Sequence, residues 1–353
     1  MKIIIIIVFG FFMNIINVNA ISADSYIVLD QESNNVLIGQ NIHEKKLIAS
    51  TSKIMTAIVA LENADIHQTV TIDKSVLKSI GSAIYIEVGE KITLNDLLYG
   101  LMLRSGNDAA IAIAVAVSGN MKNFVDLMNE YAKKIGMNNT VFYNSHGLEE
   151  QDGSGNLSTA YDMALLTSYA MKNKIFQKIF STKTYEAKSD RKTYVWQNKN
   201  KLLKYEYITG GKTGYTKKAH RTLVTTAYLN KMNLIAVTLN DSNDWEDHIT
   251  LYKKADNKYQ KLTILNKNDF EIIDDTIYAK DELYINNNVS KVIAKEDIKN
   301  LKIKYILAKT IPKSNKIGEA NIYLHNQLIA KEDIYIKNSE KQNWFKKILN
   351  FLF

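Results

Sequence analysis

Hydrophobic and polar positions repeat along the first half of the chain with the periods of strands and helices. Residues 25–39 alternate between apolar and polar side chains on both sides of a polar turn, which predicts a β-hairpin. Helical spacing of apolar residues then predicts helices at residues 50–63, 93–103, 109–117, 122–135 and 159–172. Thr93 and Asp96 resemble a capping box at the start of the second helix. The third is so rich in Ala, Ile and Val that we expect it to be buried.

Strand patterns dominate the second half of the chain. They predict strands at residues 207–213, 222–229 and 233–240, with a hairpin turn around Asn230. From about residue 266 the pattern changes to short strands rich in Ile, Tyr and Val. We therefore expect a mixed α/β domain over residues 24–265 and a small β-rich domain over residues 266–336.

The N-terminus has the layout of a secretory signal peptide. Lys2 precedes an apolar run over residues 3–13, and the small-residue sequence Val18-Asn19-Ala20 follows it. The alternative is an uncleaved membrane anchor, but the apolar run is too short to span a bilayer comfortably. We therefore expect residues 1–20 to be removed as a signal peptide and the chain to be exported.

Residues 337–353 carry the pattern of a short amphipathic helix. Trp344, Ile348 and Phe351 recur at helical spacing, and the segment holds four Lys and one Glu. Aromatic and basic residues together are typical of helices that lie on anionic membrane surfaces. The alternative is a terminal helix that packs on the protein's own core. We expect this tail to hold the exported protein peripherally on the outer face of the cytoplasmic membrane.

Composition and charge narrow the functional classes. The 353 residues, enough for about two domains, include no Cys, which excludes disulfide scaffolds, thiolate metal sites and cysteine nucleophiles. The net charge is +8, but no basic helix interleaved with aromatic residues occurs, so nucleic acid is not an expected partner. The six His residues show no paired spacing, so we expect no metal and no cofactor.

Ser50 and Lys53 are the first candidate catalytic pair. They lie three residues apart at the start of a predicted helix, a spacing that puts both side chains on one face. A reactive serine needs a base within hydrogen-bonding reach, and a helix N-terminus favours negative charge that develops near Ser50. The spacing alone is not specific, because Ser75 and Ser189 are also followed by Lys at the same distance.

Two further motifs make the pair more specific. Ser105-Gly106-Asn107 falls between two predicted helices, where a loop can project polar groups. Lys212-Thr213-Gly214 ends a predicted strand, and the sequence Lys-Thr-Gly occurs once in the chain. Ser-x-x-Lys, Ser-x-Asn and Lys-Thr-Gly motifs together are typical of penicillin-binding proteins and of class A β-lactamases.

The residues around these motifs resemble the D-alanyl-D-alanine carboxypeptidase family of low-molecular-weight, serine-type penicillin-binding proteins. The resemblance is carried by residues 48–57, 97–110, 144–148, 158–163 and 211–216. It is strong over about residues 25–250 and weaker over residues 305–336. It implies a β-lactamase/transpeptidase-like α/β (α+β) fold, in which an antiparallel sheet is flanked by helices and followed by a small β-rich domain.

The resemblance also implies catalytic roles. Ser50 would be the acylated nucleophile and Lys53 its base, which requires a neutral amine. Ser105 would relay a proton toward the leaving D-alanine. Asn107 would orient Lys53 and the substrate amide. The implied substrates are peptidoglycan stem peptides that end in D-Ala-D-Ala, and β-lactam antibiotics would acylate the same serine.

Substrate binding is implied for the Lys-Thr-Gly segment and the residue after it. Lys212 and Thr213 would hold the terminal carboxylate, next to Gly214. The backbone N–H groups of Ser50 and Tyr215 would form the oxyanion hole, whose donors are typically worth about 3 kcal/mol each.

Two departures from the family pattern bear on this site. His220 stands where the family usually has Gly, so it either narrows the site or lies at a strand edge, and we favour the strand edge. Residues 240–247 lack an Arg that many relatives carry to assist carboxylate binding. Arg221 is the candidate that could replace it. His146 belongs to a loop motif of the family, for which we expect a structural role.

Three rival functions remain open. A D,D-endopeptidase shares every motif named above. A β-lactamase shares the acylation chemistry, but class A enzymes deacylate with a Glu-activated water, and no Glu-x-x-x-Asn occurs between Asn107 and Lys212. A peripheral membrane protein could also bind peptidoglycan stem peptides without turnover.

Overall fold

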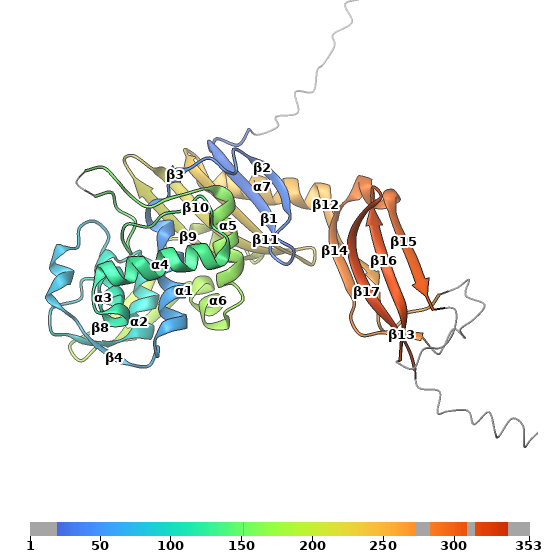
Figure 1. The fold of residues 1–353 in the computed structure, drawn as a ribbon. Helices are drawn as coiled ribbons and strands as arrows, with labels where there is room; N and C mark the ends of the chain where they lie inside the picture. Colours follow the sequence, from blue (N-terminus) through green and yellow to red (C-terminus); the bar gives the residue numbers. More distant parts are fainter. Residues whose placement is uncertain (1–19, 151, 273–282, 309–314, 338–353) are drawn as a thin grey trace, which may run out of the picture.

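The computed structural model describes residues 20–150, 152–272, 283–308 and 315–337 (Figure 1). The predicted signal peptide, apart from Ala20, and the predicted amphipathic tail, apart from Lys337, lie outside the described residues.

A five-stranded antiparallel sheet organises the larger part of the molecule. Its strand order is β2-β1-β11-β10-β9. The strands are β1 (Ser25–Asp30), β2 (Val36–Gln40), β9 (Ile208–Thr216), β10 (His220–Leu229) and β11 (Met232–Asp241). Ser25 pairs with Leu239, so the beginning of this part of the chain lies beside its end. The predicted hairpin at 25–39 and the three predicted strands are confirmed, and β9 continues through Lys212-Thr213-Gly214.

Helices cover both faces of this sheet. One side carries α1 (Lys53–Asn63), α2 (Leu94–Tyr99), α3 (Asn107–Ser118), α4 (Met121–Ile135), α5 (Ala160–Ala170) and α6 (Lys174–Ser181). The other face is covered by α7 (Asp244–Lys258). Alternation along β11 explains this layering, because Ile235 and Val237 join the core under α1–α6 while Leu234 and Ala236 join the core under α7. The expected sheet flanked by helices is therefore confirmed.

The predicted helix at 93–103 is present, but it changes from an α-helix to a π-helix part of the way along. The Thr93 hydroxyl caps α2 by accepting the Asp96 N–H at 3.0 Å. After Tyr99 the chain continues as a π-helical turn, η3 (Gly100–Arg104), which delivers the chain to Ser105.

Short elements complete this part of the chain. They are the pairs β3 (Lys46–Leu47) with β6 (Leu157–Ser158), β4 (Thr69–Thr71) with β5 (Lys91–Thr93), and β7 (Thr184–Lys188) with β8 (Thr193–Gln197). The 3-10 turns are η1 (Ala49–Ser52), η2 (Lys74–Lys78) and η4 (Lys201–Lys204).

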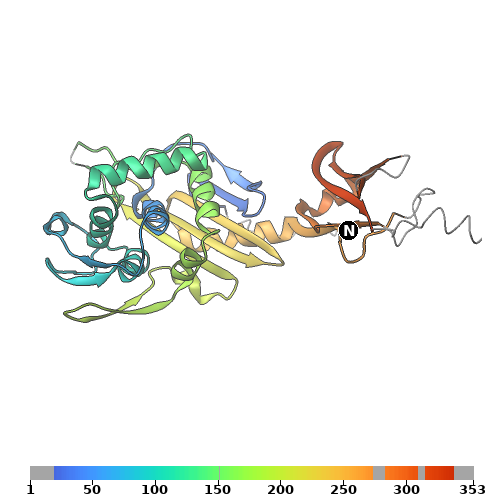
Figure 2. The ribbon, with the colours of Figure 1, turned by 60° about the horizontal axis from the view of Figure 1, so that its bottom comes forward.

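A small β unit follows α7, which leads directly into it (Figure 2). It contains β12 (Tyr259–Leu265) paired with β14 (Val289–Ala294), the 3-10 turn η6 (Lys295–Asn300), and a sheet of order β13-β17-β16-β15. The sheet strands are β13 (Leu283–Ile285), β15 (Leu301–Leu307), β16 (Lys316–Leu324) and β17 (Gln327–Ile336). This unit has a hydrophobic core of its own, which includes the fully buried Ile322 and Ile334. The expected β-rich unit is present, and the domain boundary after residue 265 stays a prediction.

Within the residues that the structure describes, no single helix has the length and apolar composition to cross a membrane. Helices α3 and α4 pass that test only as a pair, and they are bent by 86° where they meet.

Candidate active site

Ser50 lies just before α1 rather than inside it. The structure places it in the 3-10 turn η1, and the α-helix begins at Lys53. The Thr51 and Ser52 hydroxyls donate to the carbonyls of Ile48 and Ala49 at 2.6 and 2.7 Å and fix this turn. Ala49 has a φ of 46°, in the left-handed region that non-Gly residues rarely adopt. The predicted helix is therefore confirmed from Lys53 to Asn63, with a tighter turn at its start.

The Lys53 side chain is completely buried and points at three oxygens. Its Nζ lies 2.9 Å from Ser50 Oγ, 2.7 Å from Asn107 Oδ1 and 2.6 Å from the backbone carbonyl of His146. A neutral amine has two N–H groups and one lone pair. The three oxygens match the three N–H donors of a lysine ammonium, and after loss of one proton the lone pair of the amine can face the Ser50 hydroxyl while the two remaining N–H groups donate to Asn107 and His146.

The surroundings of Lys53 favour this neutral state. Burial lowers the pKa of Lys53 well below its ordinary value, and the positive charges of Lys212 and Lys199 lower it further. The negative charge of Asp108 raises the pKa of Lys53 in part. The side chain at this position is thus suited to be a base at neutral pH.

A loop over residues 144–148 brings the His146 carbonyl to the site. The Ser145 hydroxyl donates to the Ala110 carbonyl at 2.9 Å, and the Thr56 hydroxyl donates to the Ser145 carbonyl at 2.6 Å. Gly147 has a φ of 89°, and a Cβ there would collide with the Ala49 carbonyl and lie 3.0 Å from Ser50 N. A glycine is therefore required where the loop meets the turn that carries Ser50.

The His146 side chain does not supply the base. Burial and the nearby Lys53 charge lower its pKa to about 3, so the imidazole is neutral. Its Nδ1 accepts the Leu148 N–H at 3.2 Å, within the same loop. These contacts support the structural role expected for this residue.

Ser105 and Asn107 enter the site from the start of α3. Ser105 is buried and left-handed, with φ 61° and ψ 35°, where it ends η3. Asn107 donates from Nδ2 to the Ile80 carbonyl at 2.6 Å, and its backbone N–H donates to the Ser82 carbonyl at 2.7 Å. The amide is therefore held with its oxygen toward Lys53 and its nitrogen toward the segment at 80–82.

The Lys-Thr-Gly segment of β9 forms the opposite wall. Lys212 is buried, and its Nζ donates to Ser105 Oγ at 3.0 Å and to the Thr213 carbonyl at 2.6 Å. A Cβ on Gly214 would lie 2.9 Å from Ser50 N, so glycine lets β9 approach the serine backbone. Tyr215 is the next residue of the strand and is 64% exposed. We expect its backbone N–H in the oxyanion hole.

The structure thus brings all three motifs together around Ser50. Lys212 is a second buried lysine, and burial together with the Lys199 charge lowers its pKa to about 7.

Lys199 was not among the residues predicted from the sequence. Its Nζ lies 2.9 Å from Ser82 Oγ, and it joins the site through the turn after β8. Nothing in its local sequence pattern, Asn198-Lys199-Asn200, distinguishes it from a surface lysine.

Asp108 is a second residue that the sequence reasoning missed. It is buried beside Asn107, and its carboxylate accepts the backbone N–H groups of Ile84, Tyr85 and Ile86 at 3.0, 2.8 and 3.4 Å. These bonds hold the segment that follows 80–82 against α3. An acid in the first turn of an otherwise apolar, buried helix is the signal that could have identified it.

His220 and Arg221, the residues that bear on the two departures from the family pattern, are the first two residues of β10. His220 is the exposed first residue of β10, with a φ of 55°, and its Nδ1 is 2.6 Å from Asn240 Oδ1. It occupies the strand edge that we favoured, in a backbone conformation that suits glycine. Arg221 pairs with Asp244 of α7 at 3.1 Å. Its side chain therefore contacts the helix on the other face of the sheet.

No group of three or more His, Asp or Glu side chains in the described part of the chain is arranged to hold a metal ion.

Comparison with known proteins identifies the family. A family model described as D-alanyl-D-alanine carboxypeptidase matches residues 13–243, and one described as the C-terminal domain of penicillin-binding protein 5 matches residues 250–342. The chain is 29% identical over 341 residues to D-alanyl-D-alanine carboxypeptidase DacF of Bacillus subtilis, covering 92% of this chain and 87% of that protein. It is 30% identical over 361 residues to DacC of Escherichia coli, covering 94% and 88%.

Solved structures agree over nearly the whole length. Penicillin-binding protein 5 of Haemophilus influenzae is 27% identical, with a TM-score of 0.72 over 90% of this chain and 97% of that one. The D-alanyl-D-alanine carboxypeptidase DacD of Francisella tularensis is 25% identical, with a TM-score of 0.70 over 90% and 94%. The expected penicillin-binding fold is confirmed, and the chain belongs to the D-alanyl-D-alanine carboxypeptidase family.

Proposed function

We propose that this chain removes the terminal D-alanine from peptidoglycan stem peptides that end in D-Ala-D-Ala, through an acyl-enzyme on Ser50. Family membership makes the chain a serine-type D-alanyl-D-alanine carboxypeptidase. The observation that carries the assignment of residues is the buried Lys53 amine 2.9 Å from the Ser50 hydroxyl.

Acylation begins with proton transfer from Ser50 to Lys53. The neutral Lys53 amine takes the hydroxyl proton while Oγ attacks the carbonyl carbon of the scissile amide. The Asn107 and His146 oxygens, at 2.7 and 2.6 Å, hold the amine in place and stabilise the ammonium that forms. Negative charge on the former carbonyl oxygen is met by the N–H groups of Ser50 and Tyr215.

Departure of D-alanine completes the first half of the reaction. The carbon–nitrogen bond breaks as the proton held by Lys53 passes to the departing nitrogen, with the Ser105 hydroxyl as relay. Lys212, 3.0 Å from Ser105, contributes positive charge for the terminal carboxylate together with the Thr213 hydroxyl. Water then attacks the ester with Lys53 again as base, which frees the shortened peptide and restores Ser50.

The same site is proposed to be acylated by penicillin. The β-lactam amide replaces the D-alanyl amide, so its carbonyl carbon would bond to Ser50 Oγ and its ring nitrogen would take the proton. The ring nitrogen stays attached to the acyl group, so the leaving group does not diffuse away and the acyl-enzyme accumulates.

Export and membrane attachment are a further part of the proposal. Removal of residues 1–20 would place the enzyme outside the cytoplasm, and the amphipathic pattern at 337–353 supports attachment to the outer face of the cytoplasmic membrane. Both segments lie, except for one residue each, outside the described structure. Access to peptidoglycan requires this location.

Mapping of the penicilloyl-enzyme tests the assignment. The mature protein is labelled with fluorescent penicillin and digested, and D-alanine release from a pentapeptide is measured in parallel. We expect the label on the peptide that contains Ser50, and neither label nor D-alanine with Ser50→Ala. Label on Ser75 or Ser189, or label that survives in Ser50→Ala, contradicts the proposal.

A further inference from the structure

The loop over residues 144–150 contacts both walls of the candidate active site. On one side, the His146 carbonyl lies 2.6 Å from Lys53 Nζ. On the other side, the Glu149 carboxylate accepts a hydrogen bond from the hydroxyl of Thr216, the last residue of β9. Acylation as proposed uses the His146 side of this loop and leaves the Glu149 contact without a role.

The end of β9 has support from a neighbouring strand on one edge. Among the strands that the structure describes, β9 is the last of its sheet, and β10 is its neighbour. Thr216 is the final residue of β9 that pairs with β10, opposite His220. Tyr215, whose backbone N–H we expect in the oxyanion hole, directly precedes it. Because an edge strand has no partner along its open side, the position of this N–H depends on other contacts near the strand end.

The Thr216 hydroxyl supplies such contacts. It donates to the Glu149 carboxylate, and it accepts the Ala219 N–H at 3.0 Å, which closes the turn between β9 and β10. Thr216 and Ala219 are both buried, so water competes little for these bonds. A carboxylate is also a stronger acceptor than a neutral group. Glu149 therefore ties the backbone next to Tyr215 to the loop.

The same loop packs against Ser50, whose backbone N–H is the second donor expected in the oxyanion hole. A Cβ on Gly147 of the loop would lie 3.0 Å from Ser50 N, and a Cβ on Gly214 of β9 would lie 2.9 Å from it. The loop and β9 thus meet at the Ser50 backbone. How the loop is joined to β9 sets the distance between the two N–H donors.

We propose that Glu149 is a positioning residue of the oxyanion hole, which acts through the Thr216 hydroxyl to fix the Tyr215 N–H relative to the Ser50 N–H. This role rests on the proposed function, because the developing negative charge is assigned to the same two N–H groups. Such donors act by geometry, at about 2.7–3.1 Å from the oxyanion. A displacement of about 1 Å can therefore cost on the order of 10²-fold in rate.

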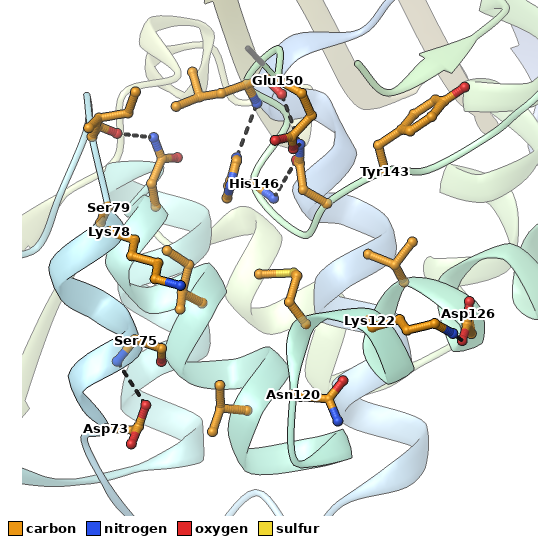
Figure 3. Close-up of a pocket in the computed structure, with 18 of the residues that line it drawn as sticks. Asp73, Ser75, Lys78, Ser79, Asn120, Lys122, Asp126, Tyr143, His146 and Glu150 are labelled. Atoms are coloured by element: carbon orange, nitrogen blue, oxygen red, sulfur yellow. Dashed lines mark hydrogen bonds and ion pairs between the residues drawn. The ribbon is translucent and has the colours of Figure 1, made fainter. Parts of the chain in front are cut away.

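Glu150, the next residue, offers a matched comparison. It is exposed, and it accepts the Asn144 Nδ2–H at 2.7 Å within its own loop. The same Nδ2 donates to the Leu148 carbonyl at 2.9 Å, so the loop keeps one of these two bonds without Glu150. Figure 3 shows Glu150 beside His146, on the wall of a cavity of about 1040 Å³. Loss of either glutamate removes a carboxylate from this wall, but only loss of Glu149 breaks the contact with Thr216.

Kinetics of the full mature enzyme test this role. We expect Glu149→Ala to lower kcat for D-alanine release by about 10- to 100-fold with KM little changed, because the donors act mainly on the transition state. Glu149→Gln keeps an oxygen that accepts the Thr216 hydroxyl, so its kcat should stay near that of the unmodified enzyme, as should the kcat of Glu150→Ala. Thr216→Val breaks the same bond from the other side and should lower kcat, whereas Thr216→Ser keeps the hydroxyl and should not.

The acyl-enzyme gives a readout that a general loss of stability does not move. Penicillin with an isotopic label in its β-lactam carbonyl acylates the enzyme, and the ester band is recorded by infrared difference spectroscopy. The N–H groups of the oxyanion hole polarise this carbonyl and lower its stretching frequency. The band of Glu149→Ala should therefore lie at a higher frequency than that of the unmodified enzyme, while Glu149→Gln and Glu150→Ala should leave it in place.

Equal kcat and an equal carbonyl band for Glu149→Ala and the unmodified enzyme overturn the positioning role and leave the proposed function intact. A lower kcat with an unmoved band also overturns it, since Glu149 would then act only on the stability of the fold. If Glu149→Ala does not fold, Thr216→Val and Thr216→Ser decide the matter by the same two measurements. Absence of an acyl-enzyme in the unmodified protein means that the proposed function itself has failed.

Discussion

The Lys53 amine and the Ser50 hydroxyl lie 2.9 Å apart, and the Lys53 side chain is completely buried. A charged lysine in this position would have to be desolvated next to Lys212, a second buried lysine, so the neutral form is favoured. If Lys53 is the base, Lys53→Arg should lower penicillin acylation by about 10²–10⁴-fold although positive charge is kept. Stopped-flow or gel-based measurement of the acylation rate tests this.

The Lys53→Arg protein must be shown to be folded by its circular dichroism and melting temperature. Lys78→Arg is the matched control, since Lys78 also lies three residues after a serine but is exposed in η2. Acylation of Lys53→Arg at a near-normal rate would mean that Lys53 acts only as a positive charge.

Activity should depend on pH through Lys212. Its pKa of about 7 means that it is cationic below pH 7 and loses its charge above it. Because a neutral Lys212 attracts the terminal carboxylate less, kcat/KM for peptide hydrolysis should fall as pH rises through about 7. At acid pH it should fall again as Lys53 becomes protonated. The pH profile of kcat/KM reports the free enzyme and is the measurement to make.

Lys212→Arg supplies the control for this prediction. Arginine stays charged throughout the range, so the decline above pH 7 should disappear even if the overall rate is lower. A profile of the unmodified enzyme that stays level up to pH 9 contradicts the assignment of Lys212.

The sequence predicted those parts of the site that depend on side-chain chemistry at fixed spacing. Ser50, Lys53 and the Lys-Thr-Gly strand could be found because helix and strand periodicity place their side chains. The His146 carbonyl could not be found in this way, because every residue has a backbone oxygen and the sequence does not mark the one that contacts Lys53. Long-range packing of the loop brings it there. The left-handed Ser105 was equally hidden, since strain of this kind is imposed by the surrounding structure.

The fold was predictable to a similar degree. Capped, amphipathic segments such as 93–103 and 122–135 formed helices close to their predicted bounds. Helix α7 was missed because Asp244–Lys258 is largely polar and shows a weak apolar stripe. Its helical state depends on Leu251, Tyr252 and Ala255 packing against the second sheet face, which no local pattern reveals.

Asp108 should be a stability determinant. Its two oxygens accept backbone N–H groups from Ile84, Tyr85 and Ile86. Asp108→Asn replaces one acceptor with an NH₂ donor that faces N–H groups, so we expect a loss of about 2–3 kcal/mol in the free energy of unfolding. Denaturant unfolding measures it. Asp126→Asn, which breaks only an exposed ion pair, should cost less than about 1 kcal/mol. Equal stabilities for these two variants would show that the Asp108 bonds contribute little.

Asp241 should make stability depend on pH. It is 2% exposed, and burial raises its pKa to about 6, with the neighbouring Asp247 charge adding to the effect. The unfolded chain ionises near pH 4 and the folded chain near pH 6, so stability is lost as pH rises between these values. Asp241→Asn keeps an oxygen that accepts the Ser22 hydroxyl and the Asn243 N–H.

The Asp241→Asn variant should therefore melt at a higher temperature than the unmodified protein at pH 8 and at the same temperature near pH 4. The expected gain at pH 8 is about 1–3 kcal/mol. Melting curves across this range test it, with the exposed Asp269→Asn as the control for charge removal. A gain of the same size at both pH values would show that ionisation is not the cause.

Membrane attachment should depend on residues 339–353. The large apolar side chains of this segment are Trp344, Phe345, Ile348, Leu349, Phe351, Leu352 and Phe353. Partial burial at ~0.5–1 kcal/mol each gives several kcal/mol, to which Lys341, Lys346 and Lys347 add up to ~1 kcal/mol each on anionic lipid. This sum suffices for reversible anchoring.

Truncation after Asn338 should therefore release a soluble enzyme that still cleaves small peptides, because Tyr215, the last residue of the proposed site, lies more than 120 residues upstream. Flotation with anionic liposomes compares the two proteins, with neutral liposomes to isolate the contribution of the lysines. Equal lipid binding by the full-length mature and truncated forms would refute the anchor. Loss of peptide cleavage on truncation would mean instead that the segment packs against the folded protein and supports it.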